Sequence, residues 1–475
     1  MKRVAVIDVV GLTESLIGEH TPRIRAFRQA GASAKIVPAF PAVTCTAQST
    51  YLTGSPASYH GIVGNGWYNR ELAEVQFWKQ SNKLVHGRKL WEELRERDSK
   101  FTCAKLFWWY NMYSSADYSI TPRPIYPADG RKVFDIYTWP YSIRTEIKND
   151  LSEFPFPTFW GPAAGRQTPQ GPPDAASRWI AESAKWTEER FHPTLSLIYL
   201  PHLDYNLQRF GPFMANEESS PSVNPVISAD LRAIDSIVGD LIDFYSKRSV
   251  QVVLLSEYGI SNANWPVHLN RILRSAGFVA VKDELGLELL DCGASKAFAV
   301  ADHQLAHIYL NDLSVEKTVR QLIEKQEGVA RVLGKSEKVA AGIDHPRAGD
   351  LIAVASEKAW FTYYYWMDDK LAPDFARTVD IHRKPGYDPV ELFVDPAISL
   401  PTAKISWRLL QKKLGFRMLM DVISLDATLV KGSHGGRPEN SAEYPVLISD
   451  QPELLKNPQI EATDVYHVLK RHLLA

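Results

Sequence analysis

The stretch VAVIDVV, residues Val4–Val10, contains only apolar side chains apart from Asp8. A continuous apolar run rich in β-branched residues is typical of a strand buried on both faces of a parallel sheet. A carboxylate in such a strand is costly to bury unless it is paired, hydrogen-bonded or bound to a cation. The stretch therefore predicts a central strand that carries a functional group near its end.

The rest of the chain alternates apolar runs with segments of helical periodicity. Further strands are expected at Ala34–Val37, Thr102–Trp108, Leu195–Leu200, Val250–Leu255 and Tyr444–Ile448. Helices are expected at Arg23–Ala30, Ser228–Tyr245 and Thr463–Leu474. Strands that alternate with helices indicate an α/β fold with a mostly parallel, doubly wound central sheet flanked by helices.

Two regions interrupt this alternation within one predicted domain over residues 1–475. Residues 109–178 are rich in Pro, Gly and Tyr, and predict an insertion that covers one end of the sheet. Residues 344–415 contain the aromatic run Trp360–Trp366 and a basic helix at Trp407–Lys413, and predict a second insertion that forms a cap. We expect the insertions, and not the shared fold, to select the substrate.

Composition and charge narrow the class of protein. The 475 residues include 54 Lys and Arg against 55 Asp and Glu, so no surface for nucleic acid polymers is indicated. The three cysteines are widely spaced without a CxxC pair, which argues against a disulfide framework and fits a reducing compartment. No apolar stretch reaches the roughly 20 residues needed to span a membrane, and the N-terminal run is too short for a signal peptide. We therefore expect a cytoplasmic protein without a membrane span.

Polar side chains lie at the carboxyl ends of three predicted strands. Asp8 ends the first strand, and Asp204 and Glu257 follow two later ones. In an open parallel sheet these ends form the ligand-binding edge. Three carboxylates at one edge repel each other, and a divalent cation is the common remedy, although a helix cap or an arginine partner explains any one of them equally well. Thr44 begins a polar stretch where a helix N-terminus would present N–H groups to an anion.

Several motifs occur in an order that resembles a known family. They are Asp8 on its strand, the block FPAVTCTAQSTYLTGSPASYHGIVGN (Phe40–Asn65), Asp204 after a strand, SEYG (Ser256–Gly259) and GSHG (Gly432–Gly435). In this order they resemble the nucleotide pyrophosphatase/phosphodiesterase branch of the alkaline phosphatase superfamily. The whole chain is also similar to a bacterial subgroup associated with gene clusters for small-molecule biosynthesis and export.

The resemblance implies an alkaline-phosphatase-like fold and a catalytic pair. Thr44 would be the nucleophile that is transiently phosphorylated, and Asn65 would bind a non-bridging phosphoryl oxygen of the substrate together with the backbone at Thr44. A threonine hydroxyl is a weak nucleophile until a metal lowers its pKa. The resemblance therefore implies a metal next to Thr44.

The same resemblance implies a metal-ligand set. Asp8 and Glu257, with Thr44, would bind the metal beside the nucleophile. Asp204 and His434 would bind a second metal that stabilises the leaving oxygen and then activates water. Such two-metal sites hold both apical oxygens of an in-line displacement.

Two positions depart from the family pattern. The family has Asp-x-x-x-His and Asp-His-Gly, whereas this chain has Gln208 four residues after Asp204, and Tyr258 after Glu257. A neutral amide is a poor zinc ligand, and a phenol with a pKa of roughly 10 must be activated before it binds as a phenolate. The oxygen-rich set leaves open a divalent zinc, manganese, magnesium or calcium ion, one or two ions or none, and a ferric ion if Tyr258 is a ligand.

Other polar residues could complete the site. Four histidines are candidate additional metal ligands, although a lone histidine is more often a hydrogen-bonded structural residue: His202, His303, His307 and His382. His303 and His307 are four residues apart beside a predicted strand at 306–310, and this spacing shares a face in a strand. Arg383 and Lys384 are candidates for binding a substrate phosphate or carboxylate, with a solvated loop as the simpler interpretation.

These observations favour a metal-dependent enzyme that hydrolyses phosphodiester or pyrophosphate bonds of a small phosphorylated or anionic substrate through a phospho-threonine intermediate. A phosphomonoester, sulfate or phosphonate substrate would suit the same fold. The alternative is a degenerate homologue that binds a small anionic or aromatic metabolite without hydrolysing it, which Gln208 and Tyr258 favour. The sequence leaves the oligomeric state open, with a homodimer as one option.

Overall fold

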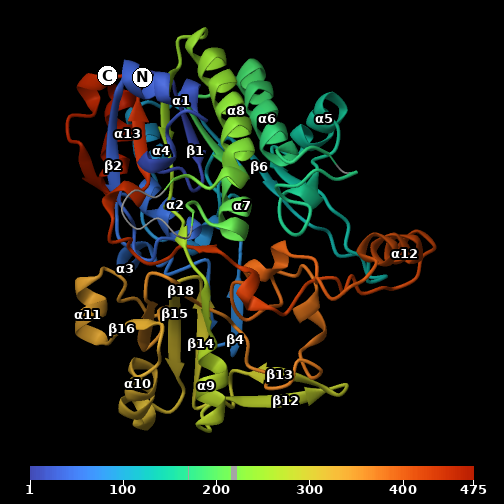
Figure 1. Cartoon of the computed structure of the whole chain (residues 1–475). Coiled ribbons are helices and arrows are strands. Elements are labelled where there is room, and N and C mark those ends of the chain that lie inside the picture. Colours follow the sequence, from blue (N-terminus) through green and yellow to red (C-terminus); the bar gives the residue numbers. More distant parts are fainter. Residues whose placement is uncertain (170, 215–221) are drawn as a thin grey trace.

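A computed structural model of the chain describes residues 1–169, 171–214 and 222–475. Its largest element is a nine-stranded sheet with the order β21-β2-β20-β9-β1-β8-β5-β6-β7 (Figure 1). The strands are β1 (Val4–Val9), β2 (Ala32–Val37), β5 (Cys103–Leu106), β6 (Tyr118–Pro122), β7 (Ile136–Trp139), β8 (Leu195–Leu200), β9 (Gln251–Leu255), β20 (Val446–Ser449) and β21 (Gln459–Glu461). Five of the eight pairings between neighbouring strands are parallel. The predicted α/β fold with a mostly parallel central sheet is confirmed.

β1 is the central strand, and its two faces contact two different cores. Ile7 packs in the core formed with α1 (Pro22–Ala30), α5 (Ser142–Leu151), α6 (Ala175–Phe191), α7 (His202–Phe210) and α8 (Ser228–Ser246). Val6 packs on the opposite face with α2 (Thr44–Thr53), α4 (Leu90–Arg97) and α13 (Asp464–Leu474). Because side chains alternate along a strand, Asp8 lies on the same face as Val6, where α2 begins.

A second, four-stranded sheet lies below the first in Figure 1, with the order β14-β15-β17-β16. Its elements and flanking helices are α9 (Leu269–Ser275), β14 (Ala297–Asp302), β15 (Leu305–Leu310), α10 (Glu316–Glu324), β16 (Val329–Leu333), α11 (Lys335–Ala340) and β17 (Leu351–Ala355). Four two-stranded pairs complete the described strands: β3 (Gly66–Asn69) with β4 (Glu74–Phe77), β10 (Ser261–Asn262) with β19 (Gly432–Ser433), β11 (Trp265–Val267) with β18 (Ala359–Phe361), and β12 (Ala280–Glu284) with β13 (Leu287–Asp291). The small sheet therefore starts well before residue 344.

The two regions that interrupt the alternation have different places in the fold. Residues 109–178 include β6 and β7, which form one edge of the main sheet. Residues 344–415 include β17 of the small sheet and the projecting helix α12 (Pro401–Lys413). The division into one domain with these two insertions stays a prediction. Within the described ranges, every helix is too short or too polar to cross a lipid bilayer.

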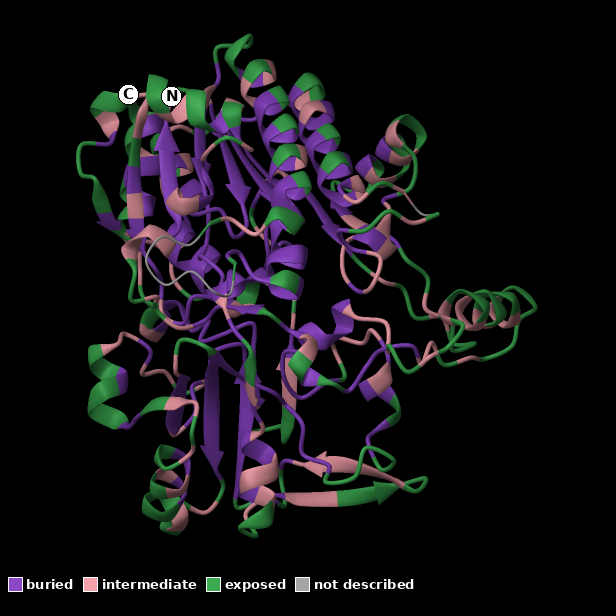
Figure 2. Ribbon diagram, in the orientation of Figure 1, coloured by how far each residue is buried: buried purple, intermediate pink, exposed green. Residues whose placement is uncertain are grey.

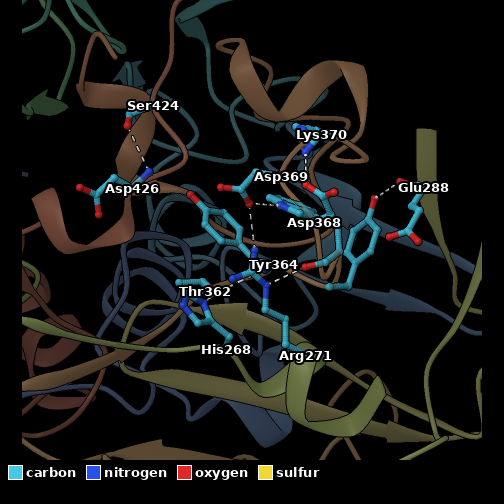
Figure 3. Close-up of polar contacts among 12 residues, drawn as sticks. His268, Arg271, Glu288, Thr362, Tyr364, Asp368, Asp369, Lys370, Ser424 and Asp426 are labelled. Carbon is cyan, nitrogen blue, oxygen red and sulfur yellow. Dashed lines mark hydrogen bonds and ion pairs between the residues drawn. The ribbon is translucent and has the colours of Figure 1, made fainter. Parts of the chain in front are cut away.

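The aromatic run at 360–366 is part of an interior core and not of a solvent-exposed face. Figure 3 shows how Arg271 of α9 reaches this run. The Arg271 Nε donates to the Trp366 carbonyl at 2.7 Å, and its guanidinium lies 5.6 Å from the ring centre of Tyr364. The ring of His268 also stacks on Tyr364, with ring centres 5.7 Å apart. These contacts attach the run to α9.

We expect Leu254→Ala to lower the free energy of unfolding by about 2–5 kcal/mol, because Leu254 is fully buried in β9 and its truncation leaves a cavity. Urea unfolding followed by circular dichroism would measure this change. The matched control is Leu285→Ala, since Leu285 is fully exposed in the turn between β12 and β13. Equal destabilisation by both substitutions would contradict the assigned core.

Candidate active site

Asp8 is a buried carboxylate without a protein donor. It lies at the end of β1 between Tyr199 of β8 and Leu255 of β9 in the sheet register. Neither of its carboxylate oxygens has a hydrogen-bond partner within the described ranges. Burial, and then the charge of Glu257, raise the pKa of Asp8 well above its usual value. A buried acceptor left in this state costs about 1–3 kcal/mol, so the group needs a compensating ligand.

Glu257 follows β9 and is the second carboxyl group of this pair. Its Oε1 accepts from Gln48 Nε2 at 2.5 Å, while its Oε2 has no partner among the residues that the structure describes. Burial raises the pKa of Glu257 to about 7, against the opposing effect of the Thr44 and Gln48 side chains. The Gln48 amide is oriented by its own acceptor oxygen, which takes the Trp109 backbone N–H at 2.7 Å.

Thr44 is the first residue of α2 and is 3% exposed. The residue before it, Val43, has no side-chain acceptor, so the N-cap residue itself does not cap the start of this helix. Asn65 lies beside this helix start, because its Oδ1 accepts from the Cys45 backbone N–H at 3.1 Å. The arrangement leaves the positive end of the helix available to an anion next to the Thr44 hydroxyl.

Asp302 orients Asn65 and was missed in the sequence. It ends β14 of the small sheet and accepts from the Asn65 backbone N–H at 2.7 Å and from its Nδ2 at 3.0 Å. Burial raises the pKa of Asp302 to about 7 against these hydrogen bonds. The motif ADHQLAH (301–307) was predicted to contribute its two histidines to the site. The neighbouring carboxyl group of Asp302, in the same motif, is the feature that could have indicated its role.

Asp204 is hydrogen-bonded by the two residues that depart from the family pattern. Gln208 Nε2 donates to its Oδ2 at 2.7 Å, and the Tyr258 hydroxyl donates to its Oδ1 at 3.2 Å. The Tyr258 hydroxyl also lies 3.3 Å from Thr44 Oγ1. Burial raises the pKa of Asp204 to about 7 although both hydrogen bonds oppose this. Tyr387 holds the Gln208 amide from the other side, at 3.0 Å from Nε2.

Three aromatic rings are stacked next to Tyr258. His434 lies on Tyr258 with ring centres 3.6 Å apart, and His303 lies at the same distance from both His434 and Tyr387. The Nδ1 of His434 faces the Ala42 carbonyl at 2.7 Å, while His434 Nε2 and His303 Nδ1 are unpartnered among the described residues. Burial lowers the pKa of His434 to about 3, so its imidazole is neutral and able to accept. His303 is in the turn between β14 and β15, so it does not share a strand face with His307.

The remaining predicted site residues have structural partners elsewhere. His202 Nε2 lies 3.0 Å from Asp230, and His307 Nε2 lies 2.9 Å from the Val63 carbonyl. The Nδ1 of His382 faces the Phe77 carbonyl at 3.2 Å. Arg383 is paired with Asp374, and the buried Lys384 with Asp388 and Glu391. The structure therefore brings together Asp8, Thr44, Asn65, Asp204, Gln208, Glu257, Tyr258, His303 and His434.

The unpartnered oxygens of Asp8 and Glu257 fit a hard divalent cation next to Thr44. Carboxylate and hydroxyl oxygens suit Mg²⁺ or Mn²⁺ better than zinc. The position around Asp204 is different, since hydrogen bonds from Gln208 and Tyr258 already occupy both of its oxygens. In the part of the chain that the structure describes, no group of three or more His, Cys, Asp or Glu side chains has a metal-binding arrangement.

Comparison with known protein families identifies the family of this chain. The sequence model of the type I phosphodiesterase / nucleotide pyrophosphatase family matches residues 4–388, which include Asp8, Thr44, Asp204 and Glu257. The chain belongs to this family. The resemblance to the nucleotide pyrophosphatase/phosphodiesterase branch of the alkaline phosphatase superfamily is thereby confirmed, and membership supports a hydrolase that acts on phosphoryl compounds.

Solved structures of this superfamily share the fold at low identity. Human ectonucleotide pyrophosphatase/phosphodiesterase 5 is 14% identical with a TM-score of 0.57, and an inactive murine counterpart in complex with AMP is 13% identical with a TM-score of 0.56. Phosphonoacetate hydrolase from Sinorhizobium meliloti, in complex with phosphonoformate, is 13% identical with a TM-score of 0.59. Each comparison covers 100% of this chain and 95% of the other. A sequence search among curated proteins finds no match.

A buried lysine supports the loop that orients Gln48. Lys105 of β5 is fully buried, and its Nζ donates to the carbonyls of Trp109 at 3.2 Å and Tyr110 at 2.9 Å. Burial lowers the pKa of Lys105 to about 7. Because Trp109 donates its N–H to Gln48, the lysine fixes the backbone on which the Gln48 and Glu257 pair depends.

The depressed pKa of Lys105 makes stability depend on pH. Between about pH 7 and about pH 10 the unfolded chain binds a proton that the folded chain does not, so the free energy of unfolding rises with pH by up to about 1.4 kcal/mol per unit. We expect Lys105→Met to remove this component in urea unfolding at about pH 7.5 and about pH 9.5. The exposed control Lys100→Met should keep it, and an unchanged slope in Lys105→Met would contradict the assignment.

We expect Mg²⁺ or Mn²⁺ to raise the melting temperature of chelator-treated protein by several degrees, because a ligand at about 100 times its Kd adds about 2.7 kcal/mol. Asp8→Asn should abolish the shift, since it removes a carboxylate that faces the cation. Asp204→Asn should retain it, because Asp204 is satisfied by protein donors. Loss of the shift in Asp204→Asn would show that Asp204 is also a ligand.

Proposed function

We propose that this protein hydrolyses phosphodiester or pyrophosphate bonds with Thr44 as the nucleophile. The observation that carries the proposal is the position of Thr44 at a helix start whose N-cap residue has no capping side chain, beside two buried carboxyl groups with oxygens that are unpartnered among the described residues. The helix start suits the phosphoryl oxygens, and the carboxyl groups suit a cation. The hydroxyl group between them is therefore adjacent to a bound phosphorus.

Thr44 has a route for its proton that is built from protein groups. The Thr44 hydroxyl donates to the Tyr258 hydroxyl, which donates to Asp204 Oδ1. As Thr44 Oγ1 forms its bond to phosphorus, its proton passes to Tyr258, whose own proton passes to Asp204, and the leaving oxygen departs with the bonding electron pair. In the second step a water oxygen bonds to phosphorus and the bond between phosphorus and Thr44 Oγ1 breaks. The proton stored on Asp204 returns through Tyr258 to Thr44 Oγ1, while the water releases one proton to solvent and keeps the other on the product phosphate.

A divalent cation held by Asp8 and Glu257 would lower the pKa of the Thr44 hydroxyl and neutralise charge on the phosphoryl group. The chain contributes the positioning around it. Gln48 holds Glu257 through Oε1 and leaves Oε2 open. Gln208 holds Asp204 through Oδ2 and leaves Oδ1 to Tyr258. In this proposal one cation beside the nucleophile is sufficient, because the hydrogen bonds to Asp204 replace a second one.

Asn65 would position one phosphoryl oxygen. Its Oδ1 is engaged by the Cys45 N–H and one Nδ2 hydrogen by Asp302, so the second Nδ2 hydrogen is left for a ligand. The complexes of two structural relatives with AMP and with phosphonoformate support a small phosphorylated or phosphonate substrate. We therefore favour a small molecule over a polymer.

The second candidate function is a protein that binds a small anion without hydrolysing it. The bonding of both Asp204 oxygens to Gln208 and Tyr258 favours it, because a second catalytic metal is then excluded at that position. The double variant Gln208→His with Tyr258→His separates the two candidates. Diesterase activity that appears only in the double variant would support the binding protein.

We expect Thr44→Ala to lower kcat for bis(4-nitrophenyl) phosphate by roughly a thousand-fold or more, since it removes the nucleophile. Thr44→Ser should retain measurable turnover, because it keeps the hydroxyl group. Acid quenching of the wild-type reaction, followed by peptide mass spectrometry, should find one 4-nitrophenyl phosphoryl group on the peptide that contains Thr44.

Two results would count against the covalent mechanism. One is turnover by Thr44→Ala at the wild-type rate. The other is an absence of the phosphoryl adduct in wild-type protein that turns over the substrate in a burst. Thermal melting of both variants should match wild type, because the contact of the Thr44 hydroxyl with the Tyr258 hydroxyl is a long one, at 3.3 Å.

A further inference from the structure

An arm formed by residues 400–421 projects from the body of the protein, at the right of Figure 1. It consists of α12 and the segment that returns from its end. No residue of α12 is buried, and Figure 2 shows the arm as exposed and intermediate throughout. Seven large apolar side chains in the arm are each at least 40% exposed: Leu400, Trp407, Leu409, Leu410, Leu414, Phe416 and Leu419.

The charged face of α12 is turned toward the returning segment, and its apolar face is turned toward solvent. Lys404 and Arg408 point back to the returning segment, where Asp421 pairs with both at 2.9 Å. Trp407, Leu410 and Leu414 follow the three-and-four spacing that places them on one face, and this face is exposed. The charged face is therefore satisfied internally, and the apolar face has no protein to cover it within the described chain.

The arm is also basic. Residues 400–421 contain five Lys and Arg against one acidic residue, Asp421, although the whole chain is close to neutral. Lys413 and Arg417 are exposed and lie close in sequence to the exposed Phe416. An exposed apolar face with aromatic groups, bordered by cations, is the pattern of a helix that lies in the interface of an anionic membrane.

Cations also come from the loop at the base of the arm. Lys412 Nζ donates to the Lys132 carbonyl at 3.2 Å, and Arg417 Nε donates to the Asp129 carbonyl at 3.3 Å. The side chains of Lys132 and Lys412 both lie within about 6 Å of the Phe134 ring centre. The loop thus adds Lys132 and a partly exposed aromatic ring to the same surface.

We propose that this arm docks the protein on an anionic phospholipid surface, with Trp407, Leu410 and Leu414 inserted among the lipid chains. The same arm of a second copy is a poorer occupant, because that contact would place one basic arm against another. An anionic bilayer instead attracts the cations and removes the apolar face from water. The protein would lie on the membrane without spanning it.

Flotation of the full-length protein with lipid vesicles tests the proposal. We expect binding to vesicles of phosphatidylcholine with about a third phosphatidylglycerol, and at least ten-fold weaker binding to phosphatidylcholine alone. The triple variant Trp407→Glu, Leu410→Glu and Leu414→Glu should lose at least ten-fold of this binding. Lys413→Glu with Arg417→Glu should weaken it and reduce its salt dependence.

The matched control is the triple variant Leu72→Glu, Leu285→Glu and Leu313→Glu, which changes three exposed leucines outside the arm. It should bind vesicles as wild type does. Each variant alters exposed side chains, so its melting temperature and its turnover of a soluble diester should be unchanged. If the proposed hydrolase activity is wrong, the wild-type protein will fail to turn over the diester, whatever the result of the flotation assay.

Three results would overturn the proposal. The first is wild-type protein that does not float with anionic vesicles. The second is equal flotation of the arm variant and wild type. The third is a wild-type dimer in sedimentation velocity that the arm variant dissociates, which would assign the arm to contact between copies of this chain.

Discussion

The burial of three carboxyl groups at one edge of the central sheet is the constraint on which the site depends. Asp8 lies on a strand with neighbours on both sides, so water cannot solvate it. Asp204 and Glu257 are buried nearby, and burial raises the pKa of all three. Each needs a donor or a cation, because an isolated buried charge is not tolerated. The surrounding polar groups are arranged to meet this requirement.

The three carboxyl groups differ in the number of protein hydrogen bonds that compensate for their burial. Asp204 receives two protein hydrogen bonds, Glu257 receives one, and Asp8 receives none from the described residues. Among these three carboxyl groups, Asp8 next to Thr44 therefore has the least compensation from the described residues. Gln208 and Tyr258 both donate to Asp204, and the Tyr258 hydroxyl also contacts the Thr44 hydroxyl. These two residues therefore connect Asp204 to Thr44 through hydrogen bonds.

The small sheet completes the site from the opposite side. The tight turn between β14 and β15 carries Asp302 and His303, which contact Asn65 and His434. His303 has a φ of +62°, which is unusual for a residue other than glycine and shows that the surrounding contacts determine its conformation. The second sheet therefore contributes to the geometry of the reacting groups as well as to the enclosure of the site.

Much of the fold and half of the site follow from local pattern. Apolar runs located the central strands to within a few residues, and the position of Asp8, Asp204 and Glu257 after such runs predicted a common edge, because parallel strands end together. The sequence could not show that β20 runs antiparallel inside the sheet, or that Asp302 reaches Asn65 across 237 residues. It also could not distinguish Lys384, which is neutralised by buried partners, from a lysine free to bind phosphate. Hydrophobic periodicity is a property of neighbouring residues and was sufficient for the strands. Hydrogen-bond and ion-pair partners depend on distances between segments remote in the chain, and only the tertiary structure decided them.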